Sequence, residues 1–129
     1  MTYEKLSTPN CTRILVVEDE FLIRMMLSDE LRDAGFEVIE ASTADDALVI
    51  LKTLKPHLII SDVRMPGTID GMALLDFVRK MSPDLPFIIS SAYFESANAN
   101  FGGPTKLVSK PYAAKHMLAE VESLLSSAV

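Results

Sequence analysis

The sequence predicts a doubly wound α/β domain, in which a five-stranded parallel sheet carries helices on both faces. Two observations lead to this fold class. Short apolar runs alternate along the chain with longer stretches that place apolar residues at helical spacing. The apolar runs are nearly continuous, as expected of strands that are buried on both faces of a sheet. We expect the 129 residues to form one compact domain.

The strands are predicted from runs that are short, apolar and bounded by polar or turn residues. The first, RILVV, is followed at once by three acids, which is unusual for the end of a buried element. We expect the order 2-1-3-4-5 in the sheet, so that the first and third strands are neighbours. The predicted strands are residues 13–17, 36–41, 57–61, 86–90 and 106–109.

Four helices are predicted from apolar periodicity and from end signals. Gly35 is typical of the end of the first helix, and Thr43 is typical of the cap of the second. The third begins near Asp70 and ends before Pro83, and the last covers about residues 113–126. The expected inward residues are Ile23, Leu27, Leu31 and Ala34, then Ala47, Leu48 and Leu51, then Leu74, Leu75 and Val78, and finally Met117, Leu118, Val121 and Leu125.

Composition argues against several classes of function. The formal net charge of −6 disfavours a general affinity for nucleic acid, because phosphate backbones are bound by clustered Lys and Arg. The apolar runs are far shorter than the roughly 20 residues that span a bilayer. Residues 1–12 lack the apolar core of a secretion signal, so we expect a flexible leader at 1–12, a domain at 13–129 and a cytoplasmic location.

Acidic residues follow two strands that are expected to be neighbours. Glu18 and Asp19 come after the first strand, and Asp62 comes after the third. Ligands bind such sheets at the carboxyl ends of the strands, so these carboxylates should lie close together. Without a cation they would repel one another and raise each other's pKa. Mg2+ takes carboxylate, phosphate and water oxygens, and we predict that the acids hold this ion.

The other two strands bring a hydroxyl and an ammonium group to the same edge. The fourth ends in SSA at residues 90–92, and the fifth ends in SKP at residues 109–111. A carboxylate is a competent nucleophile toward phosphorus when cations neutralise the charge on the phosphoryl oxygens. At this edge, a carboxylate could therefore attack phosphorus while Mg2+ and Lys110 stabilise the developing charge.

From residue 13 to about 127, the chain resembles the receiver domain of two-component response regulators. The resemblance is carried by the acidic pair, by DVRMPG at 62–67, and by the Ser-Ala and Lys-Pro pairs after the last two strands. It implies a flavodoxin-like fold and phosphorylation of Asp62 by a sensor histidine kinase. The implied roles are metal binding for Glu18, Asp19, Asp62 and the backbone carbonyl of Arg64, the switch hydroxyl for Ser91, and phosphoryl contact for Lys110.

The resemblance also implies partners and a mode of action. The expected partners are a sensor histidine kinase or histidine phosphotransfer protein and a downstream protein target, with neither nucleic acid nor membrane. The chain would be a monomer or weak dimer, and a signalling protein that catalyses only its own phosphotransfer and dephosphorylation. Four apolar residues flank the inward stripe of the first helix, where family members contact the kinase: Phe21, Leu22, Met25 and Met26.

Several features depart from the usual receiver pattern. The MPGTIDG segment at 65–71 is one residue longer than the usual loop. Residues 92–105, between the fourth and fifth strands, are short of the usual length and rich in Gly, Asn, Ser and Ala. This composition predicts that the fourth helix of the receiver fold, which would lie here, is shortened or irregular. Leu107 stands where an aromatic switch residue is usual. With LPFIISSAY, these features resemble the FATGUY group of single-domain receivers, so we expect a stand-alone receiver, with a cis bond before Pro111.

Other interpretations remain open at this point. The acids after the first strand could be first-turn helix residues, Lys110 could be a solvated turn residue, and Ser90 could replace Ser91 if the strand register is off by one. A degenerate receiver could serve as a protein-binding scaffold. A flavodoxin-type ligand module is disfavoured because VVEDEF lacks the Ser, Thr and Gly of a flavin phosphate loop, and an aspartyl phosphatase because Arg64 replaces its second Asp.

Overall fold

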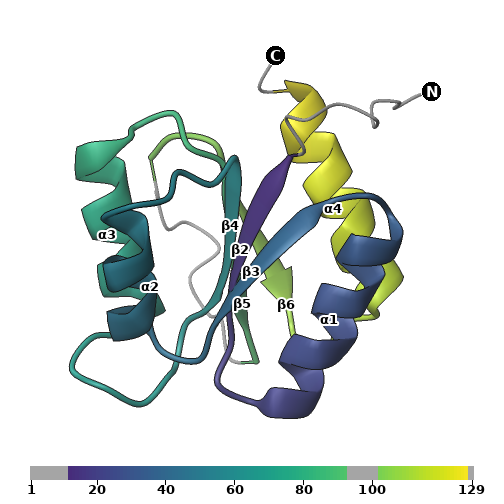
Figure 1. Cartoon of the computed structure of the whole chain (residues 1–129), viewed down its shortest axis with the longest axis horizontal. Coiled ribbons are helices and arrows are strands. Elements are labelled where there is room, and N and C mark those ends of the chain that lie inside the picture. Colours follow the sequence, from purple (N-terminus) through teal and green to yellow (C-terminus); the bar gives the residue numbers. More distant parts are fainter. Residues whose placement is uncertain (1–11, 93–101, 128–129) are drawn as a thin grey trace.

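The computed structural model describes residues 12–92 and 102–127, which form a five-stranded parallel sheet between two layers of helices (Figure 1). The order of the strands is β3-β2-β4-β5-β6, and each neighbouring pair is parallel. In chain order this is 2-1-3-4-5, so the predicted topology is confirmed. The strands are β2 (Arg13–Val17), β3 (Glu37–Ala41), β4 (Leu58–Asp62), β5 (Phe87–Ser91) and β6 (Thr105–Ser109).

The helices cover both faces of the sheet, as predicted. α1 (Phe21–Asp33) and α4 (Ala114–Ser127) lie on one face, and α2 (Ala44–Leu51) and α3 (Gly71–Met81) lie on the other (Figure 1). The predicted cap of α2 is confirmed, because the side chain of Thr43 accepts a hydrogen bond from the first turn. Asp70, near which the third helix is predicted to begin, caps α3 in the same way. The bounds of the strands agree with the predicted ones to within one residue.

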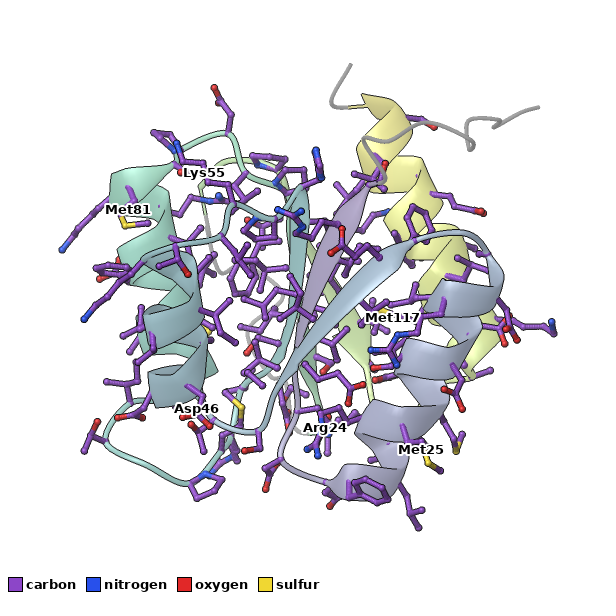
Figure 2. The ribbon with its side chains drawn as sticks, in the orientation of Figure 1. Arg24, Met25, Asp46, Lys55, Met81 and Met117 are labelled. Atoms are coloured by element: carbon purple, nitrogen blue, oxygen red, sulfur yellow. The ribbon has the colours of Figure 1, made fainter. Side chains whose placement is uncertain are left out.

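Each face of the sheet has its own apolar core. On the α1 and α4 face, Ile14, Leu31 and Met117 are fully buried, and Figure 2 shows Met117 between α4 and the sheet. On the α2 and α3 face, Leu15 and Phe87 are fully buried. Successive residues of one strand thus enter opposite cores, which explains why the strands read as continuous apolar runs.

Some predictions fall on residues 1–11 and 93–101, which lie outside the described residues. The flexible leader, the domain limits and the shortened or irregular helix between the fourth and fifth strands therefore stay predictions. Within the two described ranges, none of the helices is long and apolar enough to cross a membrane.

Candidate functional site

The acids after β2 form a short turn before α1, here called the β2–α1 turn (residues 18–20). Glu20 is the N-cap of α1, so the interpretation of Glu18 and Asp19 as first-turn helix residues is wrong. Glu18 is buried, with its N–H bonded to the carbonyl of Ala41 at 3.0 Å and its Oε2 accepting from the N–H of Glu20 at 3.0 Å. Burial raises the pKa of Glu18, against the lowering effects of the Glu20 N–H and of Lys110.

Asp62 is the last residue of β4 and is buried, at the start of a long excursion that we call the β4–α3 loop (residues 63–70). This loop closes on itself, because the N–H of Gly71 donates to the carbonyl of Val63 at 2.8 Å. A Cβ on Gly71 would lie 1.9 Å from the backbone oxygen of Asp62, so only glycine fits there. The start of α3 is therefore in direct contact with the backbone of the predicted phosphoacceptor.

Lys110 joins the two acidic elements. Its Nζ lies 3.0 Å from Oδ2 of Asp62 and 3.1 Å from Oε1 of Glu18, and its side chain is only 16% exposed. Burial, the largest influence, lowers the pKa of Lys110, but the hydrogen bonds and charges of the two carboxylates outweigh it and the pKa is raised. The solvated-turn interpretation is thus wrong, and the Lys110–Pro111 peptide is cis, as predicted.

The two serines at the end of β5 are both buried beside these residues. β5 extends to Ser91, one residue beyond the predicted end. Ser90 pairs in register with Asp62, while the carbonyl of Ser91 accepts the N–H of Lys110 at 2.9 Å. The assignment of the switch hydroxyl to Ser91 stays a prediction, as does metal binding by the carbonyl of the exposed Arg64 in the β4–α3 loop.

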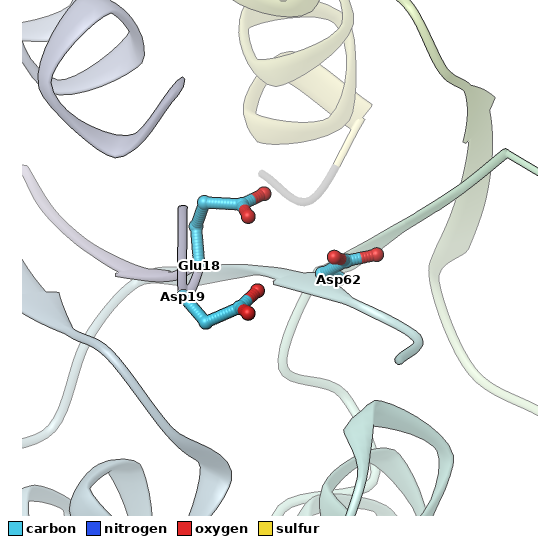
Figure 3. Close-up of side chains that lie close together, drawn as sticks. All are labelled: Glu18, Asp19 and Asp62. Carbon is cyan, nitrogen blue, oxygen red and sulfur yellow. The ribbon is translucent and has the colours of Figure 1, made fainter. Parts of the chain in front are cut away.

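The three acids suit a hard divalent cation. Glu18, Asp19 and Asp62 each offer a carboxylate oxygen within 4.8 Å of the others, and Figure 3 shows Glu18 and Asp19 extending toward the side on which Asp62 lies. In an octahedral Mg2+ shell with bonds of about 2.0–2.1 Å, opposite ligands are about 4.2 Å apart. The three carboxylate oxygens therefore need to move only slightly closer together to share one ion. When ionised, the three carboxylates outweigh Lys110 by two negative charges, which a divalent ion would balance.

Arg24 supports the site, although it carried no recognisable signal in the sequence. Its Nη1 donates to the carbonyl of Glu18 at 2.7 Å, and its Nε bonds to Oε1 of Glu40 at 3.1 Å. Its guanidinium also lies 5.6 Å from the ring centre of Phe21 (Figure 2 labels Arg24). Arg24 thus ties α1 and β3 to the β2–α1 turn. Its supporting role is recognised only from its contacts in the folded chain.

An apolar pocket of about 320 Å³ adjoins Lys110, between α1 and the chain that follows β6. Next to it, the four apolar side chains that flank the inward stripe of α1 are exposed: Phe21 by 61%, Leu22 by 65%, Met25 by 38% and Met26 by 56%. Figure 2 shows Met25 on the outer side of α1. The pocket is lined by Ile23, Met26, Leu27, Ala92, Lys110, Pro111, Tyr112 and Ala114.

A family model described as the response regulator receiver domain matches residues 14–122, most of the chain. The chain belongs to this family. The flavodoxin-type and phosphatase interpretations are therefore wrong. The acids, the serines and the lysine lie at one edge of the sheet, as the resemblance implied.

The relatives with names are longer proteins, and this chain matches only part of each. The probable transcriptional regulator ycf27 of Cyanophora paradoxa is 37% identical over 119 residues, which are 90% of this chain and 49% of that protein. The sensor kinase CckA of Brucella abortus is 37% identical over 117 residues, 87% of this chain and 12% of the kinase. The receiver thus spans about half the length, or less, of the curated relatives it matches.

Solved receivers have the same fold. The receiver domain of NtrX from Brucella abortus is 33% identical, with a TM-score of 0.79 over 88% of this chain and 98% of that one. A response regulator receiver protein from Sinorhizobium medicae gives a TM-score of 0.85 over 95% of this chain and 100% of that one. At 24% identity, this likeness supports the fold and nothing further.

Proposed function

We propose that this receiver accepts a phosphoryl group on Asp62 from a sensor histidine kinase or a histidine phosphotransfer protein. The observation that carries the proposal is the position of the Lys110 Nζ, within 3.1 Å of carboxylate oxygens of both Glu18 and Asp62. A nucleophilic carboxylate, a fixed cation and further acids for a metal are the parts that phosphoryl transfer requires. Mg2+ would be held by Glu18, Asp19, Asp62 and the backbone carbonyl of Arg64.

In the proposed reaction, a carboxylate oxygen of Asp62 attacks the phosphorus of a phosphohistidine. The phosphorus–nitrogen bond breaks, its electron pair stays on the imidazole nitrogen, and an acyl phosphate forms on Asp62. Bound Mg2+ would supply positive charge to the phosphoryl oxygens. Lys110 already points at Asp62 and needs only to turn its N–H groups to the new oxygens.

We also propose that phosphorylation shifts a two-state equilibrium. The new oxygens are strong acceptors that can draw in the hydroxyl of Ser91, which is 5% exposed at the end of β5. Because the backbone of Ser91 is bonded to that of Lys110, a movement of one reaches the other. As a stand-alone receiver, the domain would act through protein contacts, and this remains a prediction.

Asp62→Asn tests the proposal. Purified wild type and variant are incubated with phosphoramidate and Mg2+, and phosphorylation is measured by mass spectrometry with peptide mapping. Wild type should gain one phosphoryl group on the peptide that contains Asp62, and the variant none. Asp46→Asn, which changes an exposed acid of α2, is the matched control and should react like wild type.

Labelling of Asp62→Asn at the wild-type rate would overturn the assignment. A wild-type protein that takes up neither phosphate nor beryllofluoride with Mg2+, while remaining folded, would instead favour the scaffold interpretation.

A further inference from the structure

The β4–α3 loop is held at two places, and only the first belongs to the site described above. At its base, the bond between Gly71 and Val63 closes the loop. At its tip, the hydroxyl of Thr68 donates a hydrogen bond to Oδ2 of Asp45, a residue of the first turn of α2. Figure 1 shows that α2 begins at the same end of the sheet as this loop. Arg64, the predicted carbonyl ligand, lies between the two anchors.

The fit of Asp45 to the loop is close. Gly67 has a φ of +116°, which favours glycine, and a Cβ there would lie 2.7 Å from Oδ1 of Asp45, so a larger residue would also displace the Asp45 carboxylate. The hydrogen bond from Thr68, and then the backbone N–H groups of Ile69 and Thr68, lower the pKa of Asp45 against an opposing effect of burial. The neighbouring Asp46 bonds instead to Ser42, at 3.5 Å.

We propose that Asp45 is a positioning residue for the metal site, which fixes the loop tip and thereby the path of the backbone at Arg64. The inference rests on the proposed function, because it concerns the Mg2+ site. The length of the loop gives a reason for such an anchor, because eight residues, 63–70, separate β4 from α3. A longer loop has more conformations to lose, and an outside anchor removes them before the metal binds. Groups bonded directly to metal ligands typically change metal affinity by about 10–100-fold, and Asp45, which acts one step further away through Thr68, should lie at the low end of that range.

Mg2+ titration of the whole chain, followed by isothermal calorimetry and by amide NMR shifts at residues 62–65, tests the proposal. Asp45→Ala and Thr68→Val should each weaken Mg2+ binding by about tenfold. The double variant should be no weaker than the worse single one, since both remove the same contact. Asp45→Asn keeps one oxygen acceptor and should fall between Asp45→Ala and wild type. Asp46→Ala removes the adjacent acid of the same helix turn and should bind like wild type.

The outcomes separate this inference from the proposed function. If wild type binds Mg2+ and Asp45→Ala binds it equally well, Asp45 has no positioning role, even where the variant melts at a lower temperature. Additive losses in the double variant would show that Thr68 and Asp45 act separately, which also overturns the inference. If wild type itself binds no Mg2+, the proposed function fails instead.

Discussion

The β2–α1 turn and the β4–α3 loop both carry acids or carbonyls of the proposed metal site, but they are built in opposite ways. The turn has three residues and is tied directly to the sheet, because the N–H of Glu18 donates to Ala41 of β3 and the Glu18 carboxylate pairs with Lys110. The loop has eight residues and is held from outside, by α2 at its tip and by α3 at its base. The short turn is thus fixed against the sheet itself, while the tip of the longer loop is fixed by a helix outside it, and a longer segment has more conformational entropy to lose.

The two segments also differ in charge. In the turn, Glu18 forms an ion pair with Lys110, and the two side chains are 3% and 16% exposed. The loop carries no carboxylate between Val63 and Ile69, and its hydrogen bond from Thr68 to the Asp45 carboxylate is exposed. The turn should therefore respond strongly to changes of charge, and the loop to changes of backbone and of shape.

The largest expected effect is that of Gly71→Ala, at the base of the loop. Alanine is favoured over glycine in helices by about 1 kcal/mol, yet here its Cβ would meet the backbone oxygen of Asp62. We expect a net loss of about 3 kcal/mol or more in the free energy of unfolding, measured by urea denaturation. Met72→Ala, on the next and exposed residue, should change it by less than about 0.5 kcal/mol. Equal stability of the two variants would mean that the loop base yields easily.

The second prediction concerns the turn. Lys110→Met removes the cation between Glu18 and Asp62, and at pH 7 it should lower the free energy of unfolding by about 2 kcal/mol, less than for a fully enclosed pair. Saturating Mg2+ should restore part of the loss by replacing the missing charge. Lys115→Met is the control, because the exposed pair of Lys115 with Glu30 should contribute less than about 0.5 kcal/mol. A loss no greater than that of the control would contradict the proposed importance of the pair.

Periodicity predicted the fold well because it reports burial. The strand residues that enter the two cores are the apolar runs themselves, and the caps at Thr43 and Asp70 are local signals. Each depends on neighbours in the chain, so the sequence contains it. The boundary error at Ser91 arose because a serine pair reads as the end of a strand, while the partner strand extends pairing to Ser91.

The site could be predicted only as far as residue type and strand end determine it. Glu18, Asp19, Asp62 and Lys110 lie at the carboxyl ends of strands, so topology brings them together. The supporting residues were not predictable in this way. Arg24 reaches a backbone carbonyl, and Asp45 binds a loop 23 residues away along the chain. Such contacts depend on how helices pack, and a lone Arg or Asp on a helix carries no sign of them.

The third prediction asks which of the two segments faces the kinase. The apolar side chains of α1 adjoin the turn, so Met25→Glu with Met26→Glu should slow transfer from a cognate kinase by about tenfold, or about 1.4 kcal/mol. Phosphorylation by phosphoramidate should stay close to wild type, since the reactive groups are intact. Val49→Glu with Met72→Glu places the same charges on exposed apolar residues of the loop side and is the matched control. Equal slowing with both donors, or by both pairs of substitutions, would contradict docking on α1.

The smallest effect should come from alkaline pH, which acts on the turn and not on the loop. Burial, and then the charge of Glu18, raise the pKa of Tyr112 from 10.0 to about 12, with Lys110 opposing and Asp62 adding to the shift. Between these pH values the unfolded chain has released the phenol proton while the folded chain retains it. The unfolded state then binds fewer protons, so stability falls as the pH rises. Asp45, with its lowered pKa, is ionised throughout this range and affects stability only in acid.

Tyr112→Phe removes this titration and should flatten the loss. Because the side chain is only partly buried, we expect wild type to lose about 1 kcal/mol more than the variant between pH 10 and about 12, measured by urea denaturation. The raised pKa of Lys110 acts in the same direction, since its ion pairs are complete below pH 10.5 and are lost as the pH rises through the folded value. In Tyr112→Phe, the free energy of unfolding should therefore still fall with pH because of Lys110. This contribution should be smaller in Lys110→Met. Parallel curves for wild type and Tyr112→Phe would show that the phenol titrates alike in both states, and would remove Tyr112 from the charge balance around the turn.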